Sequence, residues 1–248
     1  MIATFNATPD DFAGFVHRMD ARREKLVQGC LRRDRLDFAG HAGAKCLLFK
    51  APRGFGKSVQ IALCAQAAID RKEDCVYLDL SSIWQEDVDE AEFIANMIVA
   101  VLAPQEVASM PSGRSLKNTA LDLLLAREKP VTVCLDGVTD VFAIQKFLKA
   151  ITLETPETVR LAVSERQPGS MVTLSVLPDV VTIGPSELSF TLDEARSVLP
   201  MEADQARKIF NMAGGWPLLC TLAGKSNATG ETIVHLPEIQ AYFENDVL

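Results

Sequence analysis

Short apolar runs alternate with stretches of helical periodicity along most of the chain. The runs are rich in Val, Leu, Ile and Cys and are bounded by turn or polar residues, which is typical of buried strands. Strands that alternate with helices predict right-handed crossovers and a parallel sheet, with ligands bound at the carboxyl ends of the strands. The predicted strands are residues 45–50, 75–80, 131–135, 159–163 and 180–183.

The two ends of the chain lack strand signals. Residues 1–43 have a helical pattern with seven Lys or Arg between His17 and Arg35, a mixture that we interpret as a solvated helix face rather than a partner-binding surface. From about residue 186 onward, a capping box at Thr191 to Glu194 and further helical segments, the last at residues 238–248, predict helices alone. We therefore expect an N-terminal helical segment (1–43), an α/β domain (44–185) and a small helical domain (186–248).

The overall composition narrows the class of protein. With 248 residues, 48% of them hydrophobic, the chain can form either one large domain or one domain plus a small appendage. No apolar stretch reaches the length of a membrane span, and the N-terminus lacks the features of a signal peptide, so we expect a cytoplasmic protein without membrane contact. The net charge of −8 argues against a broad nucleic-acid-binding surface on this chain. The six cysteines have no paired spacing, which favours reduced thiols over zinc ligands or disulfides.

A phosphate-binding motif follows the first predicted strand. It reads Ala51-Pro-Arg-Gly-Phe-Gly-Lys-Ser58 and leads into a helical pattern, the strand–loop–helix layout of a P-loop. Gly54 and Gly56 let the backbone turn its N–H groups toward an anion. Lys57 is expected at the β- and γ-phosphates and Ser58 at Mg²⁺. The alternative is a chance Gly-Lys-Ser sequence, since Ala51 stands where the general motif has glycine. The expected nucleotide-binding residues of this loop are Ala51, Arg53, Gly54, Phe55, Gly56, Lys57 and Ser58.

Two other predicted strands end in residues suited to the same site. The third strand ends at Asp136, the position at which a Walker B aspartate holds Mg²⁺. The fourth strand leads into Arg166. Because the carboxyl ends of parallel strands share one edge of the sheet, the P-loop, Asp136 and Arg166 should converge.

Several segments together resemble the STAND class of P-loop ATPases (ASCE division), and within it the large ATP-dependent LuxR-type regulators similar to the bacterial maltose activator. The P-loop is similar to that family's loop, in which the first position is often Ala. The run Leu161-Ala-Val-Ser-Glu-Arg166 resembles the family's sensor strand, and Gly215-Trp-Pro217 matches its Gly-x-Pro motif. Further similar segments are residues 188–196 and 242–248.

The resemblance implies both an architecture and a mechanism. The sensor strand should lie between the P-loop strand and the Walker B strand, with Arg166 at the γ-phosphate and Pro217 near the adenine. ADP is expected between the two domains in a closed resting state, which an inducer opens for exchange with ATP. The ATP form is expected to associate with itself or with another protein.

Two departures from the family pattern bear on activity. The Walker B acid of the family is usually followed by a second acid that orients the attacking water, and here that position is Gly137. We therefore expect slow or absent ATP hydrolysis, a weak ATPase at most, unless Asp140 or another carboxylate substitutes. The family also continues into further domains, among them a DNA-binding domain, and we find no helix-turn-helix in this chain. We expect no direct DNA binding by this chain, which is either part of a larger regulator or a reduced protein that acts through partners.

Three functions fit the motifs. The first is a switch module that binds ATP or ADP with Mg²⁺. The second is a small-molecule P-loop kinase, although the C-terminal part lacks an Arg-rich lid. The third is a degenerate P-loop scaffold that mediates protein contacts, an alternative that Gly137 leaves open.

Overall fold

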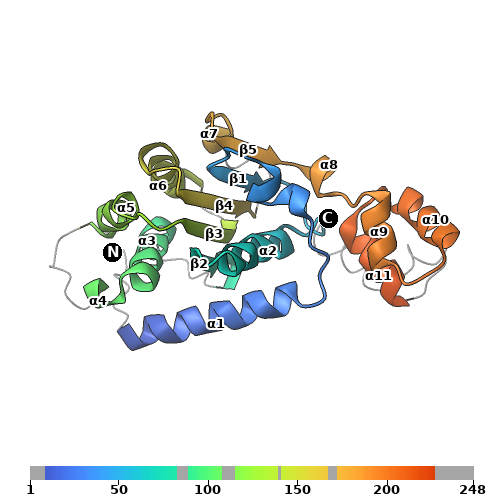
Figure 1. Cartoon of the computed structure of the whole chain (residues 1–248), viewed down its shortest axis with the longest axis horizontal. Helices are drawn as coiled ribbons and strands as arrows, with labels where there is room; N and C mark the ends of the chain where they lie inside the picture. Colours follow the sequence, from blue (N-terminus) through green and yellow to red (C-terminus); the bar gives the residue numbers. More distant parts are fainter. Residues whose placement is uncertain (1–8, 83–88, 108–114, 139–140, 167–171, 227–248) are drawn as a thin grey trace.

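The computed structural model describes residues 9–82, 89–107, 115–138, 141–166 and 172–226 (Figure 1). The helix predicted at residues 238–248 and the carboxylate of Asp140 lie outside these ranges. No helix in the described ranges is both long and apolar enough to cross a membrane.

A five-stranded sheet forms the centre of the molecule. Its strands lie in the order β2-β3-β4-β1-β5, and every neighbouring pair is parallel. This confirms the predicted parallel sheet, and it confirms that the sensor strand β4 lies between the P-loop strand β1 and the Walker B strand β3. The strands are β1 (Cys46–Phe49), β2 (Asp74–Asp79), β3 (Val131–Val138), β4 (Val159–Glu165) and β5 (Val180–Ile183).

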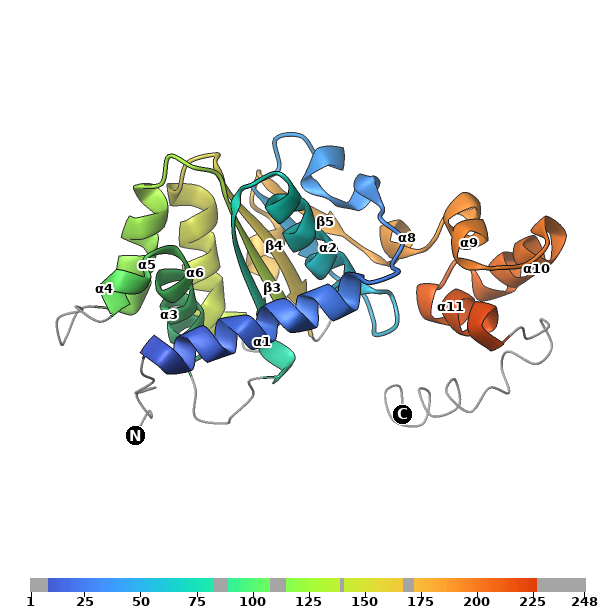
Figure 2. The same cartoon turned by 60° about the horizontal axis from the view of Figure 1, so that its bottom comes forward.

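Helices cover both faces of the sheet, as the alternating pattern predicts. On one face, α2 (Lys57–Asp70) packs against Leu47, Phe49 and Cys134, and α1 (Pro9–Val27) crosses beside it (Figure 2). On the other face, α3 (Glu90–Leu102), α5 (Leu116–Leu125) and α6 (Val141–Glu154) bury the remaining apolar strand residues. Strand residues alternate between these two clusters because successive side chains of a strand point to opposite faces.

The connections contain short elements that the sequence pattern did not resolve. Residues 28–43 were expected to be helical, but they form an irregular segment with two 3-10 turns, η1 (Asp34–Leu36) and η2 (Phe38–Gly40). A short helix, α4 (Pro104–Val107), begins at a proline, which is well suited to the first turn of a helix. The other short elements are η3 (Leu80–Ser82), α7 (Val172–Ser175) and α8 (Pro185–Leu188).

Three helices beyond β5 form a unit with its own small apolar cluster. They are α9 (Leu192–Val198), α10 (Ala203–Ala213) and α11 (Pro217–Ser226), and they lie at one end of the molecule past α8 (Figures 1 and 2). We call residues 192–226 the helical unit. The predicted capping box is present, because Thr191 Oγ1 accepts from the Glu194 N–H and Glu194 accepts in return from the Thr191 N–H. The boundaries at residues 43 and 185 stay a prediction.

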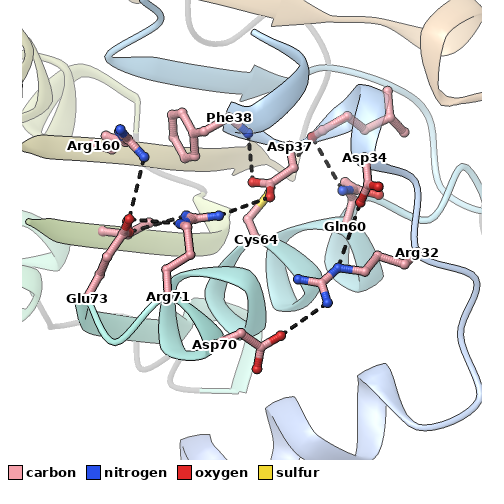
Figure 3. A network of polar contacts seen from close by, with 12 residues as sticks. Arg32, Asp34, Asp37, Phe38, Gln60, Cys64, Asp70, Arg71, Glu73 and Arg160 are labelled. Atoms are coloured by element: carbon pink, nitrogen blue, oxygen red, sulfur yellow. Dashed lines mark hydrogen bonds and ion pairs between the residues drawn. The ribbon is translucent and has the colours of Figure 1, made fainter. Parts of the chain in front are cut away.

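A polar network joins the irregular N-terminal segment to the sheet at the end opposite the P-loop (Figure 3). Arg71 donates from Nε to Glu73 Oε1 at 2.8 Å and pairs through Nη1 with Asp37 at 3.4 Å. Thr132 on β3 donates to the other Glu73 oxygen at 2.9 Å, and Arg160 on β4 lies 3.7 Å from Glu73. Burial raises the pKa of Glu73, but the bonds from Arg71 and Thr132 outweigh it and hold the pKa below its usual value.

We expect Glu73→Gln to destabilise the fold by about 1–2 kcal/mol at pH 7, since it removes charge-assisted hydrogen bonds from a nearly buried site. The pKa of Glu73 is lowered by folding, so its contribution is complete above the ordinary value of 4.5 and is lost as pH falls through the lower folded value. The difference between wild type and variant in urea unfolding should therefore shrink between pH 5 and 3. A difference that is the same at both pH values would contradict this assignment.

Candidate functional site

The phosphate loop has the backbone that its sequence predicts. It connects the buried strand β1 to the first residue of α2, and Gly54 and Gly56 adopt positive φ angles of 81° and 79°. These conformations favour glycine because it has no Cβ. The free N–H groups at the start of α2 consequently face the loop interior, the arrangement that binds phosphate. Ala51 at the motif's first position is buried against the sheet, so the substitution of glycine by alanine is accommodated there.

Lys57 folds back over its own loop. Its Nζ donates to the carbonyl oxygens of Ala51 at 2.5 Å and Pro52 at 3.1 Å. Burial lowers the pKa of Lys57 below its ordinary value, although the charges of Asp136 and Glu165 oppose the shift. A partly desolvated ammonium group held by two carbonyls gains a stronger partner when a phosphate enters the loop.

Asp136 and Ser58 lie together beneath the phosphate loop. Asp136 is 3% exposed and accepts from Ser164 Oγ at 2.5 Å. Burial raises the pKa of Asp136, while hydrogen bonds from Ser164 and Ser58 partly offset the rise. A buried carboxylate beside a hydroxyl offers the hard oxygen ligands that Mg²⁺ prefers. The described ranges contain no group of three or more His, Cys, Asp or Glu that could hold a metal ion.

A second buried aspartate, which belongs to no recognisable sequence motif, lies beside Asp136. Asp79 is the last residue of β2, is fully buried, and pairs in register with Asp136. Its Oδ1 accepts from the N–H and hydroxyl of Ser81, and its Oδ2 forms an ion pair with Arg22 of α1. In the sequence, Asp79 is recognisable only as an acid at the end of a predicted strand. Its neighbour Asp136 and its ion-pair partner Arg22 are both far away along the chain, so no local pattern connects them.

Gly137 has a conformational reason to be glycine. Its φ of 73° lies in the left-handed region, and its N–H donates to Ser164 Oγ at 2.8 Å. A Cβ at this position would lie 3.5 Å from the Cβ of Ser81. An Asp or Glu at position 137 would therefore fit sterically, but its backbone would be strained. The left-handed conformation of β3 at this position explains why it carries glycine instead of a second acid. Arg166 lies exposed just after β4, with its N–H bonded to the Val138 carbonyl at 3.0 Å.

The helical unit docks directly on the phosphate loop. The Leu218 N–H donates to the Gly54 carbonyl at 3.1 Å, and the rings of Phe55 and Trp216 lie 6.3 Å apart. The indole of Trp216 packs so closely that a Cβ on Gly54 would be 2.8 Å from its Nε1. Pro217, predicted to lie near the adenine, begins α11 beside this contact.

A cavity of about 930 Å³ opens between the phosphate loop, the N-terminal segment and the helical unit. This volume suits a nucleotide-sized ligand, since ligand pockets typically measure about 300–1,000 Å³. The cavity is lined by six of the predicted residues, Arg53, Gly54, Gly56, Lys57, Ser58 and Pro217. Four other predicted residues lie outside its lining: Ala51, Phe55, Asp136 and Arg166. Its other walls come from residues 29–31 and from Arg33, Val59, Phe190, Ser197, Val198, Pro200, Leu218, Thr221 and Gly224.

Two arginines of the N-terminal segment connect this cavity to the helical unit. Arg33 is 6% exposed, lines the cavity, donates to the Leu188 carbonyl at 2.7 Å and stacks 5.2 Å from the Phe190 ring centre. Burial lowers the pKa of Arg33 to about 10. Arg35 forms a bidentate ion pair with Glu194: its Nε donates to Oε1 at 2.9 Å and its Nη2 donates to Oε2 at 2.8 Å. The interpretation of this basic segment as a solvated face is therefore wrong for Arg33, and also for the buried Arg23, because their charges face the protein interior rather than water.

We expect Arg35→Ala to loosen the junction before α9, because Arg35 also donates to the carbonyls of Glu187 at 2.5 Å and Ser189 at 2.9 Å. Hydrogen exchange at the amide of Glu194 should speed up by at least about tenfold, which corresponds to about 1.4 kcal/mol. Arg35→Lys should give an exchange rate between those of wild type and Arg35→Ala, since lysine cannot form the bidentate ion pair. Unchanged exchange in both variants would show that this contact does not hold the junction.

Comparisons with known proteins show what the chain is similar to. No family model matches the chain. The chain is 26% identical over 232 residues to the HTH-type transcriptional regulator AlkS of Alcanivorax borkumensis, which covers 93% of this chain and 27% of that protein. It is 25% identical over 236 residues to AlkS of Pseudomonas putida, with 89% and 27% covered. The chain thus spans about a quarter of the length of the curated relatives it matches.

Among solved structures, the chain is similar to a Signal Transduction ATPase with Numerous Domains (STAND) protein with a tetratricopeptide repeat sensor from Pyrococcus horikoshii. The TM-score is 0.59 at 12% identity, covering 84% of this chain and 32% of that one. The comparisons confirm the predicted resemblance: the chain has the P-loop fold of a STAND ATPase and is similar along most of its length to larger regulators.

Proposed function

We propose that this chain is the adenine-nucleotide-binding switch module of a STAND-type signalling or transcription-regulatory ATPase. One observation carries the proposal: the phosphate loop and the helical unit together wall a single cavity of nucleotide size. A ligand that contacts both parts stabilises their closed arrangement, and a ligand with different phosphate contacts shifts that balance. The similarity to AlkS regulators supports a role in regulation.

Within this proposal, each residue has a defined role. The loop N–H groups and Lys57 bind the β- and γ-phosphates, and the oxygens of Ser58 and Asp136 hold Mg²⁺, which neutralises phosphate charge. Arg166 contacts the γ-phosphate, so it distinguishes ATP from ADP. Pro217 packs against the adenine, with Arg33 in the same cavity wall. The ADP form is the closed state, and the ATP form associates with itself or with a protein partner.

Calorimetric titration of the nucleotide-stripped chain with ADP and ATP, with and without Mg²⁺, tests the proposal. We expect one site per chain with a Kd in the micromolar range or tighter, and stronger binding of ATP when Mg²⁺ is present. The absence of binding heat for both nucleotides at several temperatures would overturn the proposal. GTP provides the control for base recognition and should bind more weakly.

A further inference from the structure

Arg33 is a nearly buried cation that forms no ion pair with a carboxylate of the described ranges. It lies directly before η1, and burial lowers its pKa only to about 10, so it is charged at neutral pH. The acid with the largest effect on this pKa is Glu194, whose two oxygens both accept hydrogen bonds from Arg35. A buried charge without a hydrogen-bonded counterion is unfavourable, and an anionic ligand beside it relieves that cost.

The guanidinium group of Arg33 lies between the phosphate loop and residues 188–191, which we call the link because they join α8 to the helical unit. Its Nη1 donates to the Leu188 carbonyl at 2.7 Å, and the group stacks on the ring of Phe190. Its Nη2 lies beside the phosphate loop, since a Cβ on Gly56 would be 3.8 Å from this atom. The planar fork of arginine presents donors in several directions, so one side chain can bind acceptors on both sides.

The charged residues in the cavity wall are all positive. Among the described residues that line the cavity these are Arg33, Arg53 and Lys57, and no Asp or Glu accompanies them. Lys57 is hydrogen-bonded to carbonyls of its own loop, whereas Arg33 is hydrogen-bonded to the link. A phosphate group that enters the cavity therefore meets a cation that already holds the segment leading to the helical unit.

We propose that Arg33 couples phosphate binding to closure of the helical unit, because it donates to a phosphate oxygen of the nucleotide while it keeps its hydrogen bond to the Leu188 carbonyl. This inference rests on the proposed nucleotide binding. The phosphate fixes the guanidinium group, and the guanidinium group fixes the link, so a bound nucleotide favours the closed arrangement. The amide of Phe190 reports this closure, since its N–H donates to the carbonyl of Gly215 in the helical unit at 2.8 Å.

The test measures two quantities in wild type and in Arg33→Gln. Calorimetry gives the affinity for ADP with Mg²⁺, and hydrogen exchange gives the rate at the Phe190 amide without ADP and at saturating ADP. The ratio of the two exchange rates is taken within each variant, so a link that is merely looser without ligand does not alter the result. In wild type, ADP should slow the exchange by at least about tenfold. Arg33→Gln should bind ADP at least about tenfold more weakly, the lower range for a charge-assisted hydrogen bond, and saturating ADP should then slow the exchange by less than about threefold.

Two further variants separate coupling from charge. Arg32→Gln removes the neighbouring positive charge, which is exposed, pairs with Asp70 at 3.1 Å and lies outside the cavity lining. It should keep the wild-type affinity and protection within about twofold, because the coupling contacts are intact. Arg33→Lys keeps the charge but presents its donors from a single nitrogen atom. It should bind ADP within about threefold of wild type and still show less than about threefold protection at Phe190.

Each other outcome decides against the proposal. Wild-type protection in Arg33→Gln at saturating ADP overturns it, as does an unchanged ADP affinity in that variant. Equal losses in Arg33→Gln and Arg32→Gln would assign the effect to the general charge of the segment. Wild type that binds ADP without protection at Phe190 overturns the coupling but leaves the proposed function intact, whereas wild type that binds no nucleotide overturns both. If Arg33→Gln does not fold, Arg33→Lys decides alone, and wild-type protection in that variant contradicts the proposal.

Discussion

Lys57→Ala is expected to weaken ADP and ATP binding by at least about 100-fold, or about 2.8 kcal/mol, with the fold unchanged. The ammonium group hydrogen-bonds the carbonyl oxygens of Ala51 and Pro52, so it lies over the loop that would hold the phosphates. Its removal deletes charge-assisted hydrogen bonds to phosphate, each worth about 1.5–3 kcal/mol. Calorimetry at constant ionic strength measures the loss.

Lys146→Ala is the matched control for this variant. Lys146 is exposed on α6, so its replacement removes one positive charge without touching the loop. It should leave the affinity within about twofold of wild type. Equal affinities for Lys57→Ala and Lys146→Ala would exclude the phosphate loop as the binding site.

Gly54→Ala is expected to disrupt the contact between the phosphate loop and the helical unit. The new Cβ would lie 2.8 Å from Trp216 Nε1 and 2.9 Å from its Cζ2, and the indole is rigid. The positive φ of Gly54 adds about 1–2 kcal/mol of backbone strain. We expect nucleotide affinity to fall by about 10- to 100-fold. Hydrogen exchange at the Leu218 amide, which bonds the Gly54 carbonyl, should speed up in parallel.

Gly43→Ala separates the two causes of this effect. Gly43 has a φ of 86°, but a Cβ there would meet nothing within 4 Å. Gly43→Ala should therefore lower the free energy of unfolding by about as much as the backbone strain at Gly54, about 1–2 kcal/mol. It should leave nucleotide affinity unchanged. In a variant that already carries Trp216→Ala, the steric clash is gone. Adding Gly54→Ala to that variant should then have only the effect of the backbone strain. A full effect in that background would show that the contact with Trp216 is not the cause.

The sheet was predictable because its central strands β3, β4 and β1 are almost entirely buried and therefore stand out as short apolar runs. The strand order was not contained in those runs. It came from the resemblance to STAND ATPases, which places the strand ending before Arg166 between its two neighbours, as the structure confirms. The irregular segment at residues 28–43 was misread as helical, since a run of arginines and apolar residues fits a helix unless their distant partners are known.

The phosphate loop was predictable because its chemistry needs adjacent residues in a fixed order, and Asp136 was predictable because it ends a short apolar strand. The structure brings Asp136 beside Ser58, as expected. The contacts of Arg35 with Glu194 and of Arg22 with Asp79 join residues far apart in the sequence, so no local pattern could indicate them. Gly137 appeared in the sequence as a missing acid, and its backbone angle gives the reason for the glycine.

The most direct test of a nucleotide clamp between the phosphate loop and the helical unit is the fluorescence of Trp216. The chain has two tryptophans, so a Trp84→Phe variant leaves Trp216 as the reporter. Titration with ADP and Mg²⁺ should change its emission in a saturable way, with the Kd that calorimetry gives, and the change should be absent in the same variant carrying Lys57→Ala. Calorimetric binding of ADP without any change in Trp216 emission would contradict the clamp.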